Sequence, residues 1–438
     1  MTCPEPIRRC FRLTPGRLVA GSFVLETFLF LSDRFGWFGF GGHKGWAVLI
    51  ALVGVGAAML LLGSWTALAV VFRWRLQFTI RSLLALTVVA SLAFSWLATE
   101  MKGAKEQKIM REMVTQSGGV PFCYKEDIGD SAGIVWREET RPTAWAWLRK
   151  LLGDDFFTDV TVVAFYPTKA TNASVERIDL KRLPRLGCLD LSWTKVTDEA
   201  MAFLEGARQI ECLNVSGTRV TDVGVARLKG LTQLRCLVLS DTNVTDAGLA
   251  HLKDLTQLRV LWLQGTKITD AGLEHLTALT QLRELWLADT KVTDAGLEHL
   301  NALGELQDLN LTRTGVRGIG LTYIKHLTKL RKLSLIETDV TDAGLKYLEG
   351  LSQLQELRLD GTEITDAGLV HLKGLTQLQS LNIHHTKVSD AAFVHLQGLP
   401  ELRELILDLT KATDENMEEL NRALPKCRIG ASDRDIEQ

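Results

Sequence analysis

Leucine positions repeat at fixed intervals over more than half of the chain, and the spacing between neighbouring leucines changes within each repeat. Leu261 and Leu263 are two residues apart, which predicts a strand with one side facing a core. Leu273, Leu276 and Leu279 are three apart, which predicts a short helix or 3₁₀ turn. Each repeat is therefore predicted to contain one strand, one turn and one helical return segment.

A threonine marks every repeat and fixes its length at 24 residues. A period kept over ten copies without insertion predicts a solenoid, in which one supersecondary unit stacks on the next. We expect the threonine hydroxyls to bond backbone groups of the turn that follows each strand, and to form a ladder that satisfies buried amides. The ten threonines are Thr194, Thr218, Thr242, Thr266, Thr290, Thr314, Thr338, Thr362, Thr386 and Thr410.

A Thr-Asp pair follows the marker threonine in most repeats. Thr269 and Asp270, for example, precede the helical leucines of their repeat, and the pair is predicted to cap free backbone amides of the return segment. The sixth repeat carries Arg317 and Gly318 at these positions instead. We expect that return segment to be looser or differently shaped, either through sequence drift or because it forms a functional notch.

The repeat unit LxxLxLxxTx(V/I)TDxGLxxLxxL has the pattern of a leucine-rich repeat. Together with the membrane-proximal runs IRSLLALTVVASLAFSWLA and WLRKLLGDDFF and the closing segment 423–427, it resembles bacterial membrane-anchored leucine-rich-repeat proteins over nearly the whole chain. The resemblance implies a solenoid fold and an interaction role. It transfers no catalytic residue, because repeat motifs specify architecture far more than partner.

The predicted fold class is α/β. We expect a curved leucine-rich-repeat solenoid with a parallel sheet on its concave face and short helices on its convex face, preceded by transmembrane α-helices. Caps are assigned at both ends because a solenoid needs its open ends covered. The predicted parts are a membrane domain (1–99), a stalk and linker (100–155), an N-terminal cap repeat with the first strand (156–193), the 24-residue repeats (194–416), and a C-terminal cap and tail (417–438).

Three apolar segments near the N-terminus are candidate membrane spans. Residues 46–72 carry no charge over 27 residues, enough to cross a hydrocarbon layer of ~30 Å. Residues 82–99 form a shorter uncharged run of 18 residues. Residues 18–32 are interrupted by Glu26 and are interpreted as a span, with a signal peptide as the alternative.

The distribution of basic residues predicts the orientation of these spans. Four arginines precede the first span and three lie between the second and third, whereas the loop 33–45 has one arginine and one lysine. By the positive-inside rule, the N-terminus is cytoplasmic and three spans place the repeats on the extracytoplasmic side. Basic residues after the last span, beginning at Lys102, favour the opposite orientation. We therefore expect a multi-pass integral membrane protein with extracytoplasmic repeats.

Composition and motifs narrow the function classes. A net charge of −2 gives no indication of nucleic-acid binding, which usually selects a strongly basic face. The chain lacks phosphate-cradling, HExxH and GxSxG motifs, so we expect no enzyme, cofactor or small-molecule substrate. Cys188, Cys212 and Cys236 are 24 residues apart and are interpreted as small residues filling one column rather than as metal ligands.

Function is expected where the repeats differ, at the positions beside the strand leucines that face the concave side. Trp262 and Trp286 are neighbours in the central column there, rimmed by carboxylates and amides, which is typical of a protein-binding hot spot. The alternative is that the two rings only cover the sheet. The candidate partner-binding residues are Val238, Val260, Trp262, Gln264, Glu284, Trp286, Asp308, Asn310 and Arg358.

These observations predict a membrane-tethered recognition module that binds a protein or peptide on the concave face of the solenoid. The alternative is a passive structural envelope or spacer protein with no discrete ligand. The tryptophan pair favours recognition, because a passive spacer has no need of adjacent large aromatic residues in the centre of a concave surface.

Overall fold

The computed structural model describes residues 80–122, 160–165 and 170–407, together with residues 410, 420, 422 and 424–430. The chain divides into two compact units. One comprises residues 1–111 and 137–159, and the other comprises residues 112–136 and 160–438. The described strands all belong to the second unit, which contains the repeats.

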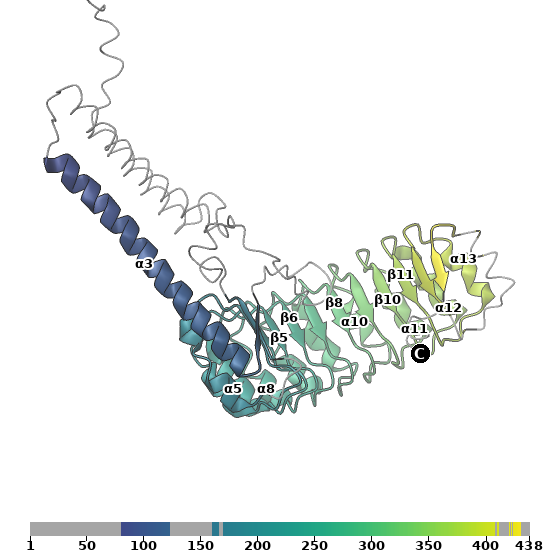
Figure 1. The fold of residues 1–438 in the computed structure, drawn as a ribbon. Coiled ribbons are helices and arrows are strands. Elements are labelled where there is room, and N and C mark those ends of the chain that lie inside the picture. Colours follow the sequence, from purple (N-terminus) through teal and green to yellow (C-terminus); the bar gives the residue numbers. More distant parts are fainter. Residues whose placement is uncertain are drawn as a thin grey trace, which may run out of the picture. The chain divides into compact units, whose positions relative to one another are not determined.

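One sheet of thirteen strands forms the described part of the repeat unit, with the strands in the order of the sequence (Figure 1). Strands β2 to β13 are parallel, and β1 pairs antiparallel with β2. The strands are β1 (Val120–Phe122), β2 (Val162–Ala164), β3 (Cys188–Asp190), β4 (Cys212–Asn214), β5 (Cys236–Val238), β6 (Val260–Trp262), β7 (Glu284–Trp286), β8 (Asp308–Asn310), β9 (Lys332–Ser334), β10 (Glu356–Arg358), β11 (Ser380–Asn382), β12 (Glu404–Ile406) and β13 (Arg428–Gly430).

Short helices return the chain from the end of one strand to the start of the next, and Figure 1 shows them in a row beside the strands. The long helix α3 (Ile80–Gln116) precedes the first strand, and the short α-helices are α5 (Asn172–Glu176), α6 (Asp198–Phe203), α7 (Asp222–Ala226), α8 (Asp246–Leu249), α9 (Asp270–Glu274), α10 (Leu321–Ile324), α11 (Asp342–Leu345), α12 (Asp366–Leu369) and α13 (Phe393–Leu396). The 3₁₀ helices are η3 (Leu180–Arg182), η4 (Arg227–Gly230), η5 (Gly296–Ala302), η6 (Lys346–Leu348), η7 (Val370–Gly374) and η8 (Asp390–Ala392).

The leucine period predicts the core correctly. Leu261 and Leu263 on the strand side and Leu273, Leu276 and Leu279 on the return segment are all fully buried. Each such side chain contributes about 2 kcal/mol when it leaves water, so the leucine stack is the main source of stability for a unit whose helices are only a few residues long. The predicted leucine-rich-repeat solenoid, with a parallel sheet and short helices, is confirmed.

The 24-residue period also sets the register of the sheet. Val260 pairs with Glu284, and Trp262 pairs with Trp286, so every strand residue lies beside its counterpart in the next repeat. The first and third residues of each strand, such as Val260 and Trp262 on β6, therefore form columns along the sheet with their counterparts in the other repeats. We call the face that carries these columns the concave face.

The marker threonines close a bond within their own repeat. The Thr266 hydroxyl donates to the carbonyl oxygen of Leu263 at 2.5 Å, and eight other repeats do the same. The predicted bonds between the hydroxyls and backbone groups of the turn are confirmed, with each hydroxyl donating to a carbonyl oxygen, whereas the predicted ladder of threonines is not formed. These bonds hold the turn of each repeat, and they do not connect one repeat to the next.

The Thr-Asp pairs form a ladder of hydrogen bonds that connects neighbouring repeats. Asp246 accepts hydrogen bonds from the backbone N–H of Thr269 at 2.8 Å and from its hydroxyl at 2.6 Å. The Thr269 hydroxyl in turn accepts from the N–H of Ala271 at 3.3 Å, which confirms the predicted helix cap. The same two bonds to the following repeat are made by Asp198, Asp222, Asp246, Asp270, Asp342 and Asp366.

The ladder is interrupted where the sequence departs from the pattern. Gly318 has no carboxylate to offer, and Thr341 in the next repeat makes no side-chain cap bond. Gly318 adopts φ of 101°, and helix α10 begins at Leu321 rather than at position 318. Asp294 of the preceding repeat accepts from the N–H groups of Arg317 and Gly320. The return segment is therefore differently shaped, as predicted.

The N-terminal edge of the sheet differs from the sequence-based expectation. Strand β1 lies in the segment predicted as stalk and linker, and it pairs antiparallel along the edge of β2. Strand β2, in the predicted cap repeat, pairs in parallel with β3. An added antiparallel strand covers backbone groups that an open edge would leave free. The three-residue length of β1 and its proline left no period-two signal in the sequence.

Helix α3 runs over 37 residues and contains the predicted span 82–99. Within the part of the chain that the structure describes, no helix is both long enough and apolar enough to cross a membrane. The structure thus has residues 82–99 within a helix. The predicted spans 18–32 and 46–72 lie outside the described residues.

Candidate functional site

Two tryptophan rings stack at the middle of the concave face. Trp262 on β6 and Trp286 on β7 are register partners, and the parallel sheet spacing brings their ring centroids to 4.1 Å with an angle of 4° between the planes. Both side chains are half-buried. Such a stack presents a broad, rigid apolar surface with little side-chain entropy left to lose on binding.

The N-terminal half of this face is a buried cluster rather than an open surface. Cys188, Cys212 and Cys236 form one column of it. Val238 and Val260, two of the predicted binding residues, belong to the same cluster and are only 2% and 5% exposed. Their role is packing: they support one side of Trp262, which is partly buried against the cluster. Their orientation follows from the period, but their burial does not.

The cysteine column is a group of potential metal-binding side chains. The three thiols lie in line on neighbouring strands, and they are buried among valine side chains. Among the residues that the structure describes, no group of three or more histidine, cysteine, aspartate or glutamate side chains is placed to hold a metal ion. The geometry fits small residues filling one column of the sheet.

Two carboxylates lie next to the tryptophan pair. Glu284 on β7 and Asp308 on β8 are register partners, and Glu284 is only 7% exposed. Burial, reinforced by the charge of Asp308, raises the pKa of Glu284 from 4.5 to about 7. Burial likewise raises the pKa of Asp308 from 3.8 to about 6, although the nearby Lys332 opposes the rise. Burial is the main cause for both groups, and a neighbouring carboxylate adds to it: Asp308 for Glu284, and Glu356 for Asp308.

The polar atoms around the tryptophan pair are incompletely satisfied. The indole N–H of Trp262 is near enough to the Glu284 carboxylate to lower its pKa, and Trp286 affects Asp308 in the same way. Neither contact reaches hydrogen-bond geometry, so both indole nitrogens are buried without a partner. The side-chain oxygen of Gln264 is also buried and unpaired. Buried polar atoms without partners are rare in folded proteins and are often found at functional sites.

The C-terminal half of the concave face is more open and carries paired charges. Glu356 on β10 forms ion pairs with Lys332 at 3.5 Å and with Arg358 at 3.4 Å. Arg358, a predicted binding residue, is exposed. Asn310 is half-buried, and its side-chain oxygen accepts from the N–H of Thr312, which holds the turn after β8.

A further column, which the sequence analysis missed, runs along the rim where the strands end. The residue just before the marker threonine has a positive φ in nine consecutive repeats, although only three of the nine are glycine. A left-handed conformation costs a non-glycine residue about 1 kcal/mol or more. The nine positions are Trp193, Gly217, Asp241, Gly265, Asp289, Arg313, Glu337, Gly361 and His385.

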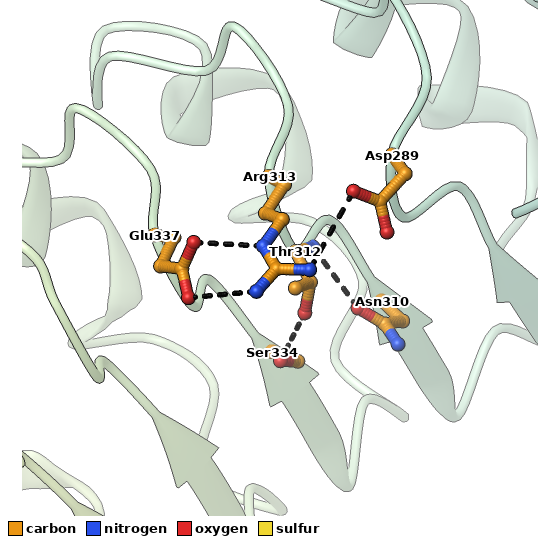
Figure 2. A network of polar contacts seen from close by, with 6 residues as sticks. All are labelled: Asp289, Asn310, Thr312, Arg313, Ser334 and Glu337. Atoms are coloured by element: carbon orange, nitrogen blue, oxygen red, sulfur yellow. Dashed lines mark hydrogen bonds and ion pairs between the residues drawn. The ribbon is translucent and has the colours of Figure 1, made fainter. Parts of the chain in front are cut away.

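This conformation carries charged side chains along the rim, as Figure 2 shows for three neighbouring repeats. Arg313 makes two hydrogen bonds with Glu337, at 2.7 and 3.0 Å, and approaches Asp289 at 3.9 Å. The hydrogen bond to Glu337 raises the pKa of Arg313. Beneath them the hydroxyl groups of Thr312 and Ser334 are 2.9 Å apart. The rim next to the tryptophan pair is therefore polar and ordered.

The structure brings most of the predicted binding residues together around one centre. Trp262, Trp286, Glu284 and Asp308 are adjacent, with Gln264 beside them, whereas Val238 and Val260 lie in the packed cluster and Arg358 lies on β10, three strands beyond β7. The glycines at 217, 265 and 361, each directly before a marker threonine, were the one sequence signal for the rim column.

The fold and this site define a leucine-rich-repeat solenoid whose concave face is packed at one end and open at the other. No protein-family model matches the chain, and no curated protein matches it. The solved structures to which it is similar are leucine-rich-repeat proteins.

Three of these structures illustrate the similarity. An internalin (inlF) from Listeria monocytogenes has a TM-score of 0.46 and 22% identity, with 64% of this chain and 92% of that chain covered. Internalin C2 of the same organism has a TM-score of 0.39 and 29% identity, covering 49% and 84%. A leucine-rich-repeat protein from Leptospira interrogans has a TM-score of 0.39 and 18% identity, covering 57% and 79%.

Proposed function

We propose that the protein is a recognition module that binds a protein or peptide partner on the concave face of its solenoid. The stacked pair Trp262 and Trp286 carries this proposal. Large, well-packed aromatic residues at the centre of a surface, surrounded by polar groups, provide most of the binding energy in many protein interfaces. The partner approaches from the open half of the face, because the opposite half is filled by the valine and cysteine cluster.

The arrangement favours binding over catalysis. Glu284 and Asp308 have pKa values near neutrality, as catalytic carboxylates often have, but they lie beside stacked indoles. A reaction site needs a nucleophile or an electrostatic stabiliser in reach of the acid and base. On the described concave face the neighbours are tryptophan, asparagine, valine and Lys332, whose ion pair with Glu356 occupies it, and no nucleophile lies beside the carboxylates.

Photo-crosslinking in intact cells tests the proposal. A photoreactive amino acid replaces Asn310 on the open concave face, and a second variant carries it at Glu274 on the exposed return side. We expect adducts from position 310 and not from position 274, and we expect the double substitution Trp262→Ala and Trp286→Ala to abolish them. Circular dichroism of the double variant checks that the solenoid remains folded.

Two results would contradict the proposal. Adducts at position 310 that persist in the double tryptophan variant would exclude the stacked pair as the binding centre. An absence of adducts at both positions would favour the passive spacer, which has no discrete partner.

The proposal includes a membrane tether, with the repeats on the extracytoplasmic side. It rests on the uncharged length of residues 46–72, on the apolar segment 18–32 and on the distribution of arginines around them. Alkaline extraction of membranes tests the tether, since an integral protein stays in the pellet. Protease added to intact cells or spheroplasts tests the orientation, because only extracytoplasmic repeats would be digested.

A further inference from the structure

Several ion pairs join side chains of opposite charge in neighbouring repeats. Glu305 pairs with Lys329 at 2.6 Å, and Arg313 pairs with Glu337, each over a separation of 24 residues. This is the expected solution for an in-register parallel stack, in which each side chain lies beside its counterpart in the next repeat. Like charges directly opposite each other destabilise such a stack.

Glu284 and Asp308 depart from that rule. Among the concave-facing positions of β3 to β12, they are the one pair of neighbours that carry charge of the same sign. Glu284 is more than nine-tenths buried, and within the described residues it has no ion pair and no hydrogen bond of normal geometry. A carboxylate in such a place lacks the compensation that a buried charge requires.

The cations nearest to this pair are already engaged. Lys332 and Arg358 both form ion pairs with Glu356 on β10, at 3.5 and 3.4 Å. Lys332, the register partner of Asp308, lowers the pKa of both carboxyl groups without restoring their ordinary values, and neither carboxylate forms an ion pair with a described residue.

We propose that the occupant of this site is a protein segment that presents a lysine or arginine side chain to Glu284 and Asp308, with its aliphatic stem against the Trp262 and Trp286 stack. This inference rests on the proposed function, because it names the chemistry of the partner at the same surface. A cation supplies the charge that the pair lacks. Lysine and arginine also carry a long apolar stem, which suits the aromatic surface, and a cation near an indole face gains cation–π attraction.

A peptide-display selection on the immobilised full-length chain tests this inference. The probe is a library of random linear peptides, and the readout is the frequency of lysine and arginine in recovered sequences relative to the input. For recovered arginine peptides, replacement of arginine by citrulline removes the charge while keeping the shape. We expect enrichment of cationic residues, and we expect the citrulline replacement to weaken binding roughly tenfold or more.

Matched variants locate the effect. Glu284→Gln with Asp308→Asn removes the two charges at the site with almost no change in volume. Glu274→Gln with Glu298→Gln removes two charges at the same 24-residue spacing from the exposed return segments. We expect the site variant to lose the recovered cationic peptides by roughly tenfold or more, and the control pair to retain them.

The outcomes separate this inference from the proposed function. Peptides that need the tryptophan pair but show no cationic enrichment, or that bind the site variant unchanged, would overturn the cationic partner and leave the recognition role intact. Peptides that bind equally to the Trp262→Ala and Trp286→Ala double variant, or a selection that yields no specific peptide, would overturn both.

Discussion

Replacing Glu284 by glutamine should stabilise the protein, and the gain should depend on pH. Glu284 is almost fully buried, and burial together with Asp308 raises its pKa from 4.5 to about 7. Glutamine keeps the shape and the hydrogen-bonding capacity of the side chain but cannot ionise. The substitution therefore removes the charge that destabilises this part of the sheet, and nothing else of comparable size.

The sign follows from proton linkage. The folded protein holds the Glu284 proton more tightly than the unfolded chain does, so the stability from this group is fully present below pH 4.5 and is lost as pH rises through about 7. At about 1.4 kcal/mol per pKa unit the loss is about 3 kcal/mol, and contact of the carboxyl group with water reduces it to about 2 kcal/mol. Glutamine recovers this amount above neutral pH and little of it in acid.

Thermal unfolding measures the effect. We expect the midpoint of Glu284→Gln to exceed that of the wild type by about 4 °C more at about pH 8 than at about pH 5, on the scale of about 2 °C per kcal/mol for a domain of this size. Glu298→Gln, an exposed glutamate on η5, serves as the control and should give no pH-dependent difference. An equal shift of Glu284→Gln at both pH values would refute the reasoning, because the gain would then not arise from ionisation.

Three further substitutions test the ladders and the interrupted rung by urea unfolding. Asp246→Ala removes both acceptor bonds to Thr269 and should lower the free energy of unfolding by about 2 kcal/mol; wild-type stability would show that the ladder does not join the repeats. Thr266→Val leaves the Leu263 carbonyl with only the longer, 3.3 Å bond from the backbone N–H of residue 266 and should cost about 1 kcal/mol, whereas Thr266→Ser should cost less; equal losses would exclude the hydroxyl as the cause. Gly318→Ala should cost about 1–2 kcal/mol, because φ is 101° and the new Cβ would lie 3.1 Å from the Gly344 Cα, whereas Gly304→Ala meets open space and should be neutral.

The sequence predicts those features that depend on the period. Because the register of the sheet equals the repeat length, counting 24 residues places Trp262 beside Trp286 and directs Leu261 and Leu263 into the core. The helix caps were predictable for a similar reason, since a threonine before a short helix bonds locally.

Features that depend on neighbours outside the period were not predictable. Alternation tells that Val238 and Val260 point to the concave side, but only the folded arrangement shows that they are buried in a cluster with the cysteine column. The hydrogen bonds of Asp246 run to the next repeat, and a single copy of the motif gives no sign of this. The left-handed rim residues are mostly not glycine, so composition conceals their conformation.

The charge of Glu284 has opposite expected effects on the stability of the fold and on the affinity for a cationic partner. Opposite charges in successive repeats stabilise an in-register parallel stack, as those of Asp289, Arg313 and Glu337 do along the rim. Glu284 and Asp308 carry charge of the same sign. Removing these charges stabilises the unbound protein, whereas the charged carboxylates strengthen binding of a cationic partner. Glu284→Gln should therefore raise the unfolding midpoint and weaken cationic peptides in the same protein, which is the relation found where a destabilised site serves function. If the protein is a passive spacer, Glu284→Gln should raise the unfolding midpoint, and neither the wild type nor the variant should bind cationic peptides specifically.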